Sequence, residues 1–156
     1  MTKEASATPQ DFAIRYEWQE GSLPPPGHYE YTIRVGPVSE GEIVFYPDYP
    51  QHDPPVWTER FVVDGAAWDR LYRLMVDKGV FGKAWKEMDR PPVGGSLYWL
   101  YATAHGERVT VSQTMVGTET LEEVVDAVRA LVPQEIWTKL RSQHDQYEQE
   151  YFERRR

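Results

Sequence analysis

The sequence of 156 residues contains no cysteine. Disulfide bonds, thiolate zinc sites, iron–sulfur clusters and cysteine nucleophiles are therefore excluded. It also lacks any apolar run near the length of about 20 residues that a membrane-spanning helix requires. The first ten residues, MTKEASATPQ, are polar and have no apolar segment typical of a secretory signal. We therefore expect no membrane partner and a cytoplasmic location.

Positive charge is scarce, with 17 Lys and Arg against 25 Asp and Glu, which gives a formal net charge of −8. A protein with this charge repels the phosphates of nucleic acids and anionic lipids. The three terminal arginines, Arg154, Arg155 and Arg156, form a local exception that we interpret as a solvated chain end. We therefore expect no nucleic-acid partner.

Sequence motifs for phosphate binding, dinucleotide binding and hydrolysis are also absent. The chain has no GxxxxGK[ST], no GxGxxG, no GxSxG and no HExxH. Its four histidines, His28, His52, His105 and His144, are scattered over segments of different predicted structure. We therefore expect no cofactor and no assignable catalytic residue, and we favour a binding module over an enzyme.

The segment most like a site is YPDYPQHDPP, residues 46–55. Asp48, His52 and Asp53 are weak candidates for divalent-metal ligands, because imidazole and carboxylates suit zinc or manganese. The four prolines also favour a stiff connector between two strands, which is the interpretation that we prefer. The loop PPVGGS, residues 91–96, exposes backbone donors that suit an anion. A pocket between these two loops, in a small-molecule or metal-binding protein or a hydrolase, is the alternative function.

Six segments of the chain are rich in apolar and aromatic residues in the period-two pattern of strands. Strand 96–104 has large rings at consecutive positions, which predicts that both of its faces are covered. The segments are residues 11–20, 28–35, 42–46, 56–64, 96–104 and 108–113.

Three helices are predicted from apolar stripes of helical spacing. The first is expected to begin after Asp64, a good N-cap, and to end at Gly79. The second is expected to begin with a capping box of Thr120 and Glu123. Pro133 is expected to begin the third, since proline suits a first helical turn.

The order of these elements predicts an α+β fold. We expect a mainly antiparallel, twisted sheet of about six strands, with two helices on one face and a long C-terminal helix. Residues 1–10 are expected to form a disordered leader and residues 11–132 a single domain. Residues 133–156 are expected to form an amphipathic helix that packs on this domain or on a partner.

Three segments, YEYTIRV, GEIVFYPDY and RFVVDGAAWDRLYRLMVDKGVF, resemble small bacterial α+β domains of uncharacterised families. In those domains, strands of a twisted sheet precede a helix that ends in a glycine and an aromatic residue. The resemblance covers roughly residues 29–132 and rests on the order of the elements. It implies a fold type and no catalytic residue.

Aromatic residues are abundant, at 13% of the chain, and many fall in predicted strands. Helices of this size cannot cover both faces of one sheet, so we expect some rings to be exposed or covered by another copy. Such rings are common at protein interfaces. The leading hypothesis is a non-enzymatic, self-associating or protein-binding module, acting as a homodimer or with a protein partner. Its interface candidates lie on the last helix: Ile136, Trp137, Leu140, Tyr147, Tyr151 and Phe152.

Overall fold

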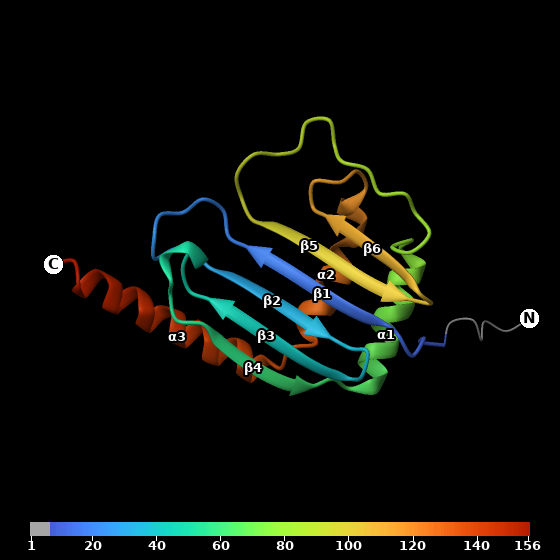
Figure 1. Cartoon of the computed structure of the whole chain (residues 1–156), viewed down its shortest axis with the longest axis horizontal. Coiled ribbons are helices and arrows are strands. Elements are labelled where there is room, and N and C mark those ends of the chain that lie inside the picture. Colours follow the sequence, from blue (N-terminus) through green and yellow to red (C-terminus); the bar gives the residue numbers. More distant parts are fainter. Residues whose placement is uncertain (1–6) are drawn as a thin grey trace, which may run out of the picture.

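A computed structural model describes residues 7–156 as one six-stranded sheet with three α-helices (Figure 1). All neighbouring strands are antiparallel, in the order β4-β3-β2-β1-β5-β6. The predicted α+β class is therefore confirmed. The strands are β1 Ala13–Gln19, β2 Glu30–Val35, β3 Glu40–Tyr46, β4 Trp57–Val62, β5 Leu97–Ala104 and β6 Glu107–Ser112.

The three helices, α1 Gly65–Asp77, α2 Glu122–Ala130 and α3 Gln134–Glu153, lie behind the sheet in Figure 1. The face turned towards the viewer carries no helix, and we call it the open face. Because side chains alternate between the two faces along each strand, this one-sided arrangement buries every second side chain. In β5, for example, partly exposed and buried side chains alternate along the whole strand.

The ends of α1 match the sequence prediction. The Asp64 carboxylate accepts a hydrogen bond of 3.1 Å from the Ala67 N–H, and Gly79 adopts a φ of +74° just after the helix.

The predicted capping box of α2 is wrong. A 3-10 turn, Thr118–Leu121, precedes α2 there, and the Thr120 hydroxyl donates to the Gly117 carbonyl at 2.8 Å.

Strand β5 is not covered on both faces, contrary to the sequence prediction. It is the second strand from one edge of the sheet, and its buried face carries Tyr98 and Leu100. Trp99 and Tyr101 lie on the open face, where they are half-buried. The Arg15 guanidinium, 4.0 Å from the centre of the Tyr101 ring, supplies part of that cover. A cation over an aromatic face is a favourable contact at the surface.

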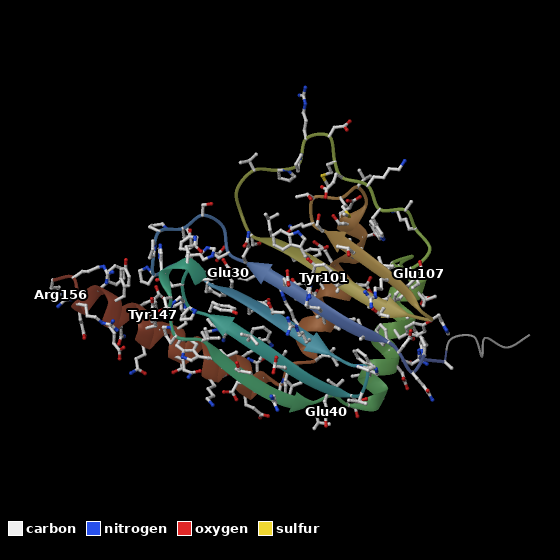
Figure 2. All side chains as sticks on the ribbon, viewed as in Figure 1. Glu30, Glu40, Tyr101, Glu107, Tyr147 and Arg156 are labelled. Carbon is white, nitrogen blue, oxygen red and sulfur yellow. The ribbon has the colours of Figure 1, made fainter. Side chains whose placement is uncertain are left out.

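Helix α3 begins after Pro133, as predicted, and runs past the end of the sheet (Figure 1). Only Leu140 and His144 are buried along its 20 residues. Figure 2 shows Arg156 at the tip of this helix, at the left and away from the sheet. The first half of α3 therefore completes the core, whereas the last turns project from it.

The predicted leader, residues 1–10, lies partly outside the described residues. In the described part, the Thr8 hydroxyl donates a hydrogen bond of 2.6 Å to Asp69 of α1, and the Phe12 N–H donates to the Pro9 carbonyl. In residues 7–156, no helix has the length and hydrophobicity needed to cross a membrane.

The close contact between Gly41 of β3 and the Phe61 ring of β4 leads to a stability prediction. Gly41 lies opposite Phe61, and a Cβ at this position would come within 2.3 Å of the Phe61 ring. Gly41→Ala should therefore lower the free energy of unfolding by about 1–3 kcal/mol, because the buried ring must move. Gly65→Ala is the matched control, since a Cβ there meets nothing within 4 Å. Urea denaturation of both variants checks this, and equal effects would contradict it.

Candidate functional site

Asp48, in the loop 46–55, is a structural carboxylate that anchors α3. It is 2% exposed, and each of its oxygens has a partner. Oδ1 accepts from the Tyr49 N–H at 2.7 Å and lies 3.3 Å from His52 Nδ1. Oδ2 accepts from the Tyr147 hydroxyl of α3 at 2.8 Å. A buried carboxylate requires such donors, and here they join the loop to the helix.

The three weak metal candidates do not converge. Asp48 and His52 are neighbours, but the His52 side chain is 50% exposed and Asp53 is fully at the surface. Asp53 adopts a φ of +51° where it ends a short 3-10 turn. Within residues 7–156, no group of three or more His, Asp or Glu is placed to hold a metal ion. The geometry favours the connector interpretation of this loop.

The two loops of the alternative site line different cavities. Asp48, His52 and Asp53 line a hollow of about 650 Å³ whose other wall is the second half of α3. Pro92 and Ser96 line another hollow, of about 550 Å³, beside α2. Residues 91–95 are exposed, and Gly94 and Gly95 have positive φ angles typical of loop geometry.

The buried face of the sheet carries a line of five rings across five adjacent strands, which we call the aromatic row. The strand register places one ring of each strand opposite the next. Directly opposed side chains on one face are close enough to contact. Ring centres of neighbours in the row lie 5.2 to 6.4 Å apart along β1, β2, β3 and β4. From β5 to β4 the row consists of Tyr98, Trp18, Tyr31, Phe45 and Trp57.

Helix α3 covers only part of the aromatic row. Trp137 packs edge-on against Tyr31 at 5.1 Å, and His144 packs edge-on against Phe45 at 5.9 Å. His144 Nε2 lies 3.2 Å from the carbonyl oxygen of Pro26, which joins α3 to the loop before β2. Trp18 stays half-buried, so the row is left accessible at β1.

Arg129, from the last turn of α2, reaches over this accessible part of the row. Its Nε donates to the Tyr31 hydroxyl at 3.1 Å and its Nη2 to the Tyr16 hydroxyl at 3.4 Å. Its guanidinium carbon lies 6.0 Å from the ring centres of both Tyr16 and Trp18. Arg129 is half-buried and forms no ion pair with a carboxylate of residues 7–156.

The protonation of this group is fixed by its surroundings. Burial raises the pKa of Tyr16 to about 12 and raises the pKa of Tyr31 further. Burial disfavours the charge of Arg129, but its interactions with Tyr31 and Tyr16 outweigh this effect and raise its pKa. At neutral pH the guanidinium is therefore charged and both phenols are neutral. The cluster carries one positive charge without an internal counter-ion.

A cleft of about 570 Å³ opens beside Arg129, between the aromatic row and α3. We call it the aromatic cleft. Arg141 stands on its α3 side, and both Arg129 and Arg141 lower the pKa of Tyr29, which burial and Glu20 raise. The cleft thus combines flat rings with two cationic groups. Its other lining residues are Trp18, Gly27, Tyr29, Tyr31, Phe45, Trp137, Leu140, His144 and Glu148.

The structure separates the six interface candidates into three groups. Leu140 is fully buried in the core, and Ile136 and Trp137 pack against that core, so these three stabilise the fold itself. Tyr147 is bound to Asp48. Tyr151 and Phe152 lie in the projecting turns, and Phe152 is 55% exposed. The interface hypothesis stays a prediction that rests on these last residues.

Sequence reasoning missed Arg129. It lies within an apolar stripe, between Val128 and Leu131, where a long cation usually reaches solvent. The available signal was a basic residue in the last helical turn, followed directly by three apolar residues, 130–132. That signal gives no information about the two phenols, which lie 98 and 113 residues earlier.

Comparison with models of protein families and with curated proteins found no match to this sequence. The resemblance to small bacterial α+β domains therefore stays a prediction.

The anchoring of α3 by Asp48 can be tested by mutation. Tyr147→Phe removes the hydroxyl that donates to Asp48 and should lower the free energy of unfolding by about 1–2 kcal/mol, because it leaves a buried carboxylate oxygen without a donor. Tyr151→Phe, one helical turn later, is the control, because its hydroxyl has no hydrogen-bond partner within residues 7–156. Urea denaturation measures both, and a loss in the control as large as that in Tyr147→Phe would contradict the assignment.

Stability should also depend on alkaline pH. The pKa of Tyr16 and of Tyr147 is raised from 10.0 to about 12, in both cases mainly by burial. The raised values contribute stability that is complete below pH about 10 and is lost as pH rises from about 10 to about 12, since the unfolded chain releases these protons first. Urea denaturation across this interval should show the fall, and the fall should be shallower in Tyr16→Phe. An identical slope in both proteins would count against the assignment.

Proposed function

We propose that this chain is a non-enzymatic protein-interaction module, whose aromatic cleft binds a partner segment carrying an aromatic side chain beside a carboxylate. One observation carries the proposal: Arg129 is a half-buried cation held over Trp18 by two neutral phenols. The phenols use two of the N–H donors of Arg129, and an incoming carboxylate would accept charge-assisted hydrogen bonds from the others. The adjoining rings offer an apolar surface for an aromatic side chain.

A polypeptide segment fits the shape of the site better than a compact molecule. The aromatic cleft is open to solvent, and Trp18 and Arg129 also line the neighbouring hollow of about 550 Å³ beside α2. The two hollows share these two residues, and we infer that they form one groove along the aromatic row. Extended and helical peptide segments both occupy grooves of this kind, with side chains placed in successive pockets.

Binding is favoured over catalysis at the Arg129 cluster, because its three groups hold their protons at neutral pH. The phenols of Tyr16 and Tyr31 have raised pKa values, and Arg129 stays charged. A general base or nucleophile needs a pKa near the working pH, which none of these groups has. Their arrangement suits recognition of a fixed charge.

The alternative function, a small-molecule or metal-binding protein or a hydrolase near residues 46–55 and 91–96, has less support. The two loops line separate hollows, and the oxygens of Asp48 already accept hydrogen bonds from the protein. Self-association through the last helix has one observation in its favour, the exposure of Phe152.

The proposed function predicts a charge-dependent preference between two small peptides. The chain should bind the capped dipeptide acetyl-Glu-Phe-amide about tenfold more tightly than acetyl-Gln-Phe-amide, because only the first offers a carboxylate to the guanidinium. Arg129→Gln should abolish this preference, and Arg129→Lys, which keeps the charge but loses the planar fork, should retain part of it. Isothermal titration calorimetry or NMR titration measures each affinity.

The matched control is Arg34→Gln. Arg34 is an exposed arginine of β2, and its side chain lies on the open face, because it alternates with the buried Ile33 and Val35. This variant should keep the full preference for the acidic dipeptide. Equal binding of both dipeptides by the unchanged chain, or a preference that persists in Arg129→Gln, would refute the proposed function.

A further inference from the structure

The groove that contains the aromatic cleft has opposite charges at its two ends. The end lined by α3 carries Arg141 and one acidic residue, Glu148, and Arg129 of α2 lines both ends. Beyond Trp18 and Arg129, the wall formed by α2 and the turn before it is acidic, with Glu119, Glu122 and Asp126. A segment that fits this groove therefore has an acidic part, an aromatic centre and a basic part, in that order.

The last turns of α3 present groups of these kinds in the same order. Phe152 is 55% exposed and is the one aromatic residue among the exposed large apolar side chains of residues 7–156. Asp145, Glu148 and Glu150 precede it along the helix, and three arginines follow it after Glu153. Positions 148, 152 and 156 are four residues apart, so they share one helix face and span about 12 Å.

These turns are ordered and stand clear of the sheet. The N–H groups of residues 154, 155 and 156 donate to carbonyls three or four residues earlier, so the helical turn continues to the arginines. Figure 1 shows this part of α3 beyond the edge of the sheet, and Figure 2 places Arg156 at its tip. The contacts that the arginines make within the chain are exposed ones, such as Arg154 to Glu150 at 3.6 Å. Contacts of this type contribute little and are readily exchanged.

We propose that the partner segment is the end of α3 from a second copy of this chain, residues 145–156, bound in the groove with Phe152 beside Trp18. This inference rests on the proposed function and names its partner. The arginines of the incoming helix face Glu119, Glu122 and Asp126, and its acidic residues face Arg129 and Arg141. Because the two contacting surfaces differ, the contact is heterologous, and repeating it produces either a closed ring of copies or an open chain.

Analytical ultracentrifugation of the full chain tests the association. The average mass should rise above that of the monomer with increasing concentration, and it should fall when salt is raised from about 0.05 M to about 0.5 M, since charge pairs at the surface are screened. Phe152→Ala should weaken the association about thirtyfold, because it removes the aromatic anchor. Val76→Ala, at an exposed apolar position of α1, should leave it unchanged.

Charge reversal provides the specific test of the orientation. Reversing the tail with Arg154→Glu, Arg155→Glu and Arg156→Glu should weaken association about tenfold or more, and so should reversing the wall with Glu119→Lys, Glu122→Lys and Asp126→Lys. A mixture of the two reversed proteins should recover association, because each supplies the charge that the other now requires. All of these positions are exposed, and circular dichroism checks that the variants remain folded.

A peptide of residues 145–156 separates this inference from the proposed function. It should bind the full chain and compete with acetyl-Glu-Phe-amide. If the chain stays monomeric and the peptide does not bind, while the acidic dipeptide still binds through Arg129, the inference fails and the proposed function stands. If neither the peptide nor the dipeptide binds, both fail. Association that is unaffected by Phe152→Ala and by both charge reversals would also overturn the inference.

Discussion

The register of the sheet is the constraint on which the rest of this structure depends. Five strands each place one ring at the same level, and the aromatic row exists because all four ladders between them hold that register. A slip of one residue in any strand would turn its ring to the open face. Helix α3 and Arg129 both pack on the row, so they depend on the same alignment.

Two elements, α3 and α2, pack on the aromatic row, and the aromatic cleft lies between the parts of the row that each of them covers. Helix α3 covers Tyr31 and Phe45 through Trp137 and His144, whereas Arg129 of α2 reaches over Trp18, whose ring also packs against Tyr29. A guanidinium can stack on a ring and donate hydrogen bonds in its own plane at the same time. Arg129 uses two of its donors on phenols of the core, and its remaining donors stay available at the cleft. The aromatic cleft therefore results from the way in which Arg129 and α3 pack on the buried face of the sheet.

Much of the fold could be predicted from the sequence. Because only one face of the sheet is buried, apolar and polar residues alternate with a period of two along each strand. The same reasoning failed for β5, where Trp99 and Tyr101 suggested a second covered face. The large rings on the open face of β5 are covered by polar neighbours such as Arg15. A sequence pattern does not distinguish rings covered in this way from rings buried in a core.

The site was harder to predict. Asp48 was singled out, but its partner Tyr147 lies 99 residues away. Contacts over such separations leave no local signal.

The open face of the sheet gives this molecule a surface that can change independently of its core. Its charged residues form local pairs, such as Arg60 with Glu42 at 3.7 Å, and pairs of this type contribute little to stability. Every second residue of each strand belongs to this face, so the two sets of positions are interleaved but physically separate. Mutations can therefore accumulate on one side of each strand over evolutionary time, while selection keeps the other side nearly constant. Related chains that share this fold would be recognised by their buried rings and would differ most in the charges between them.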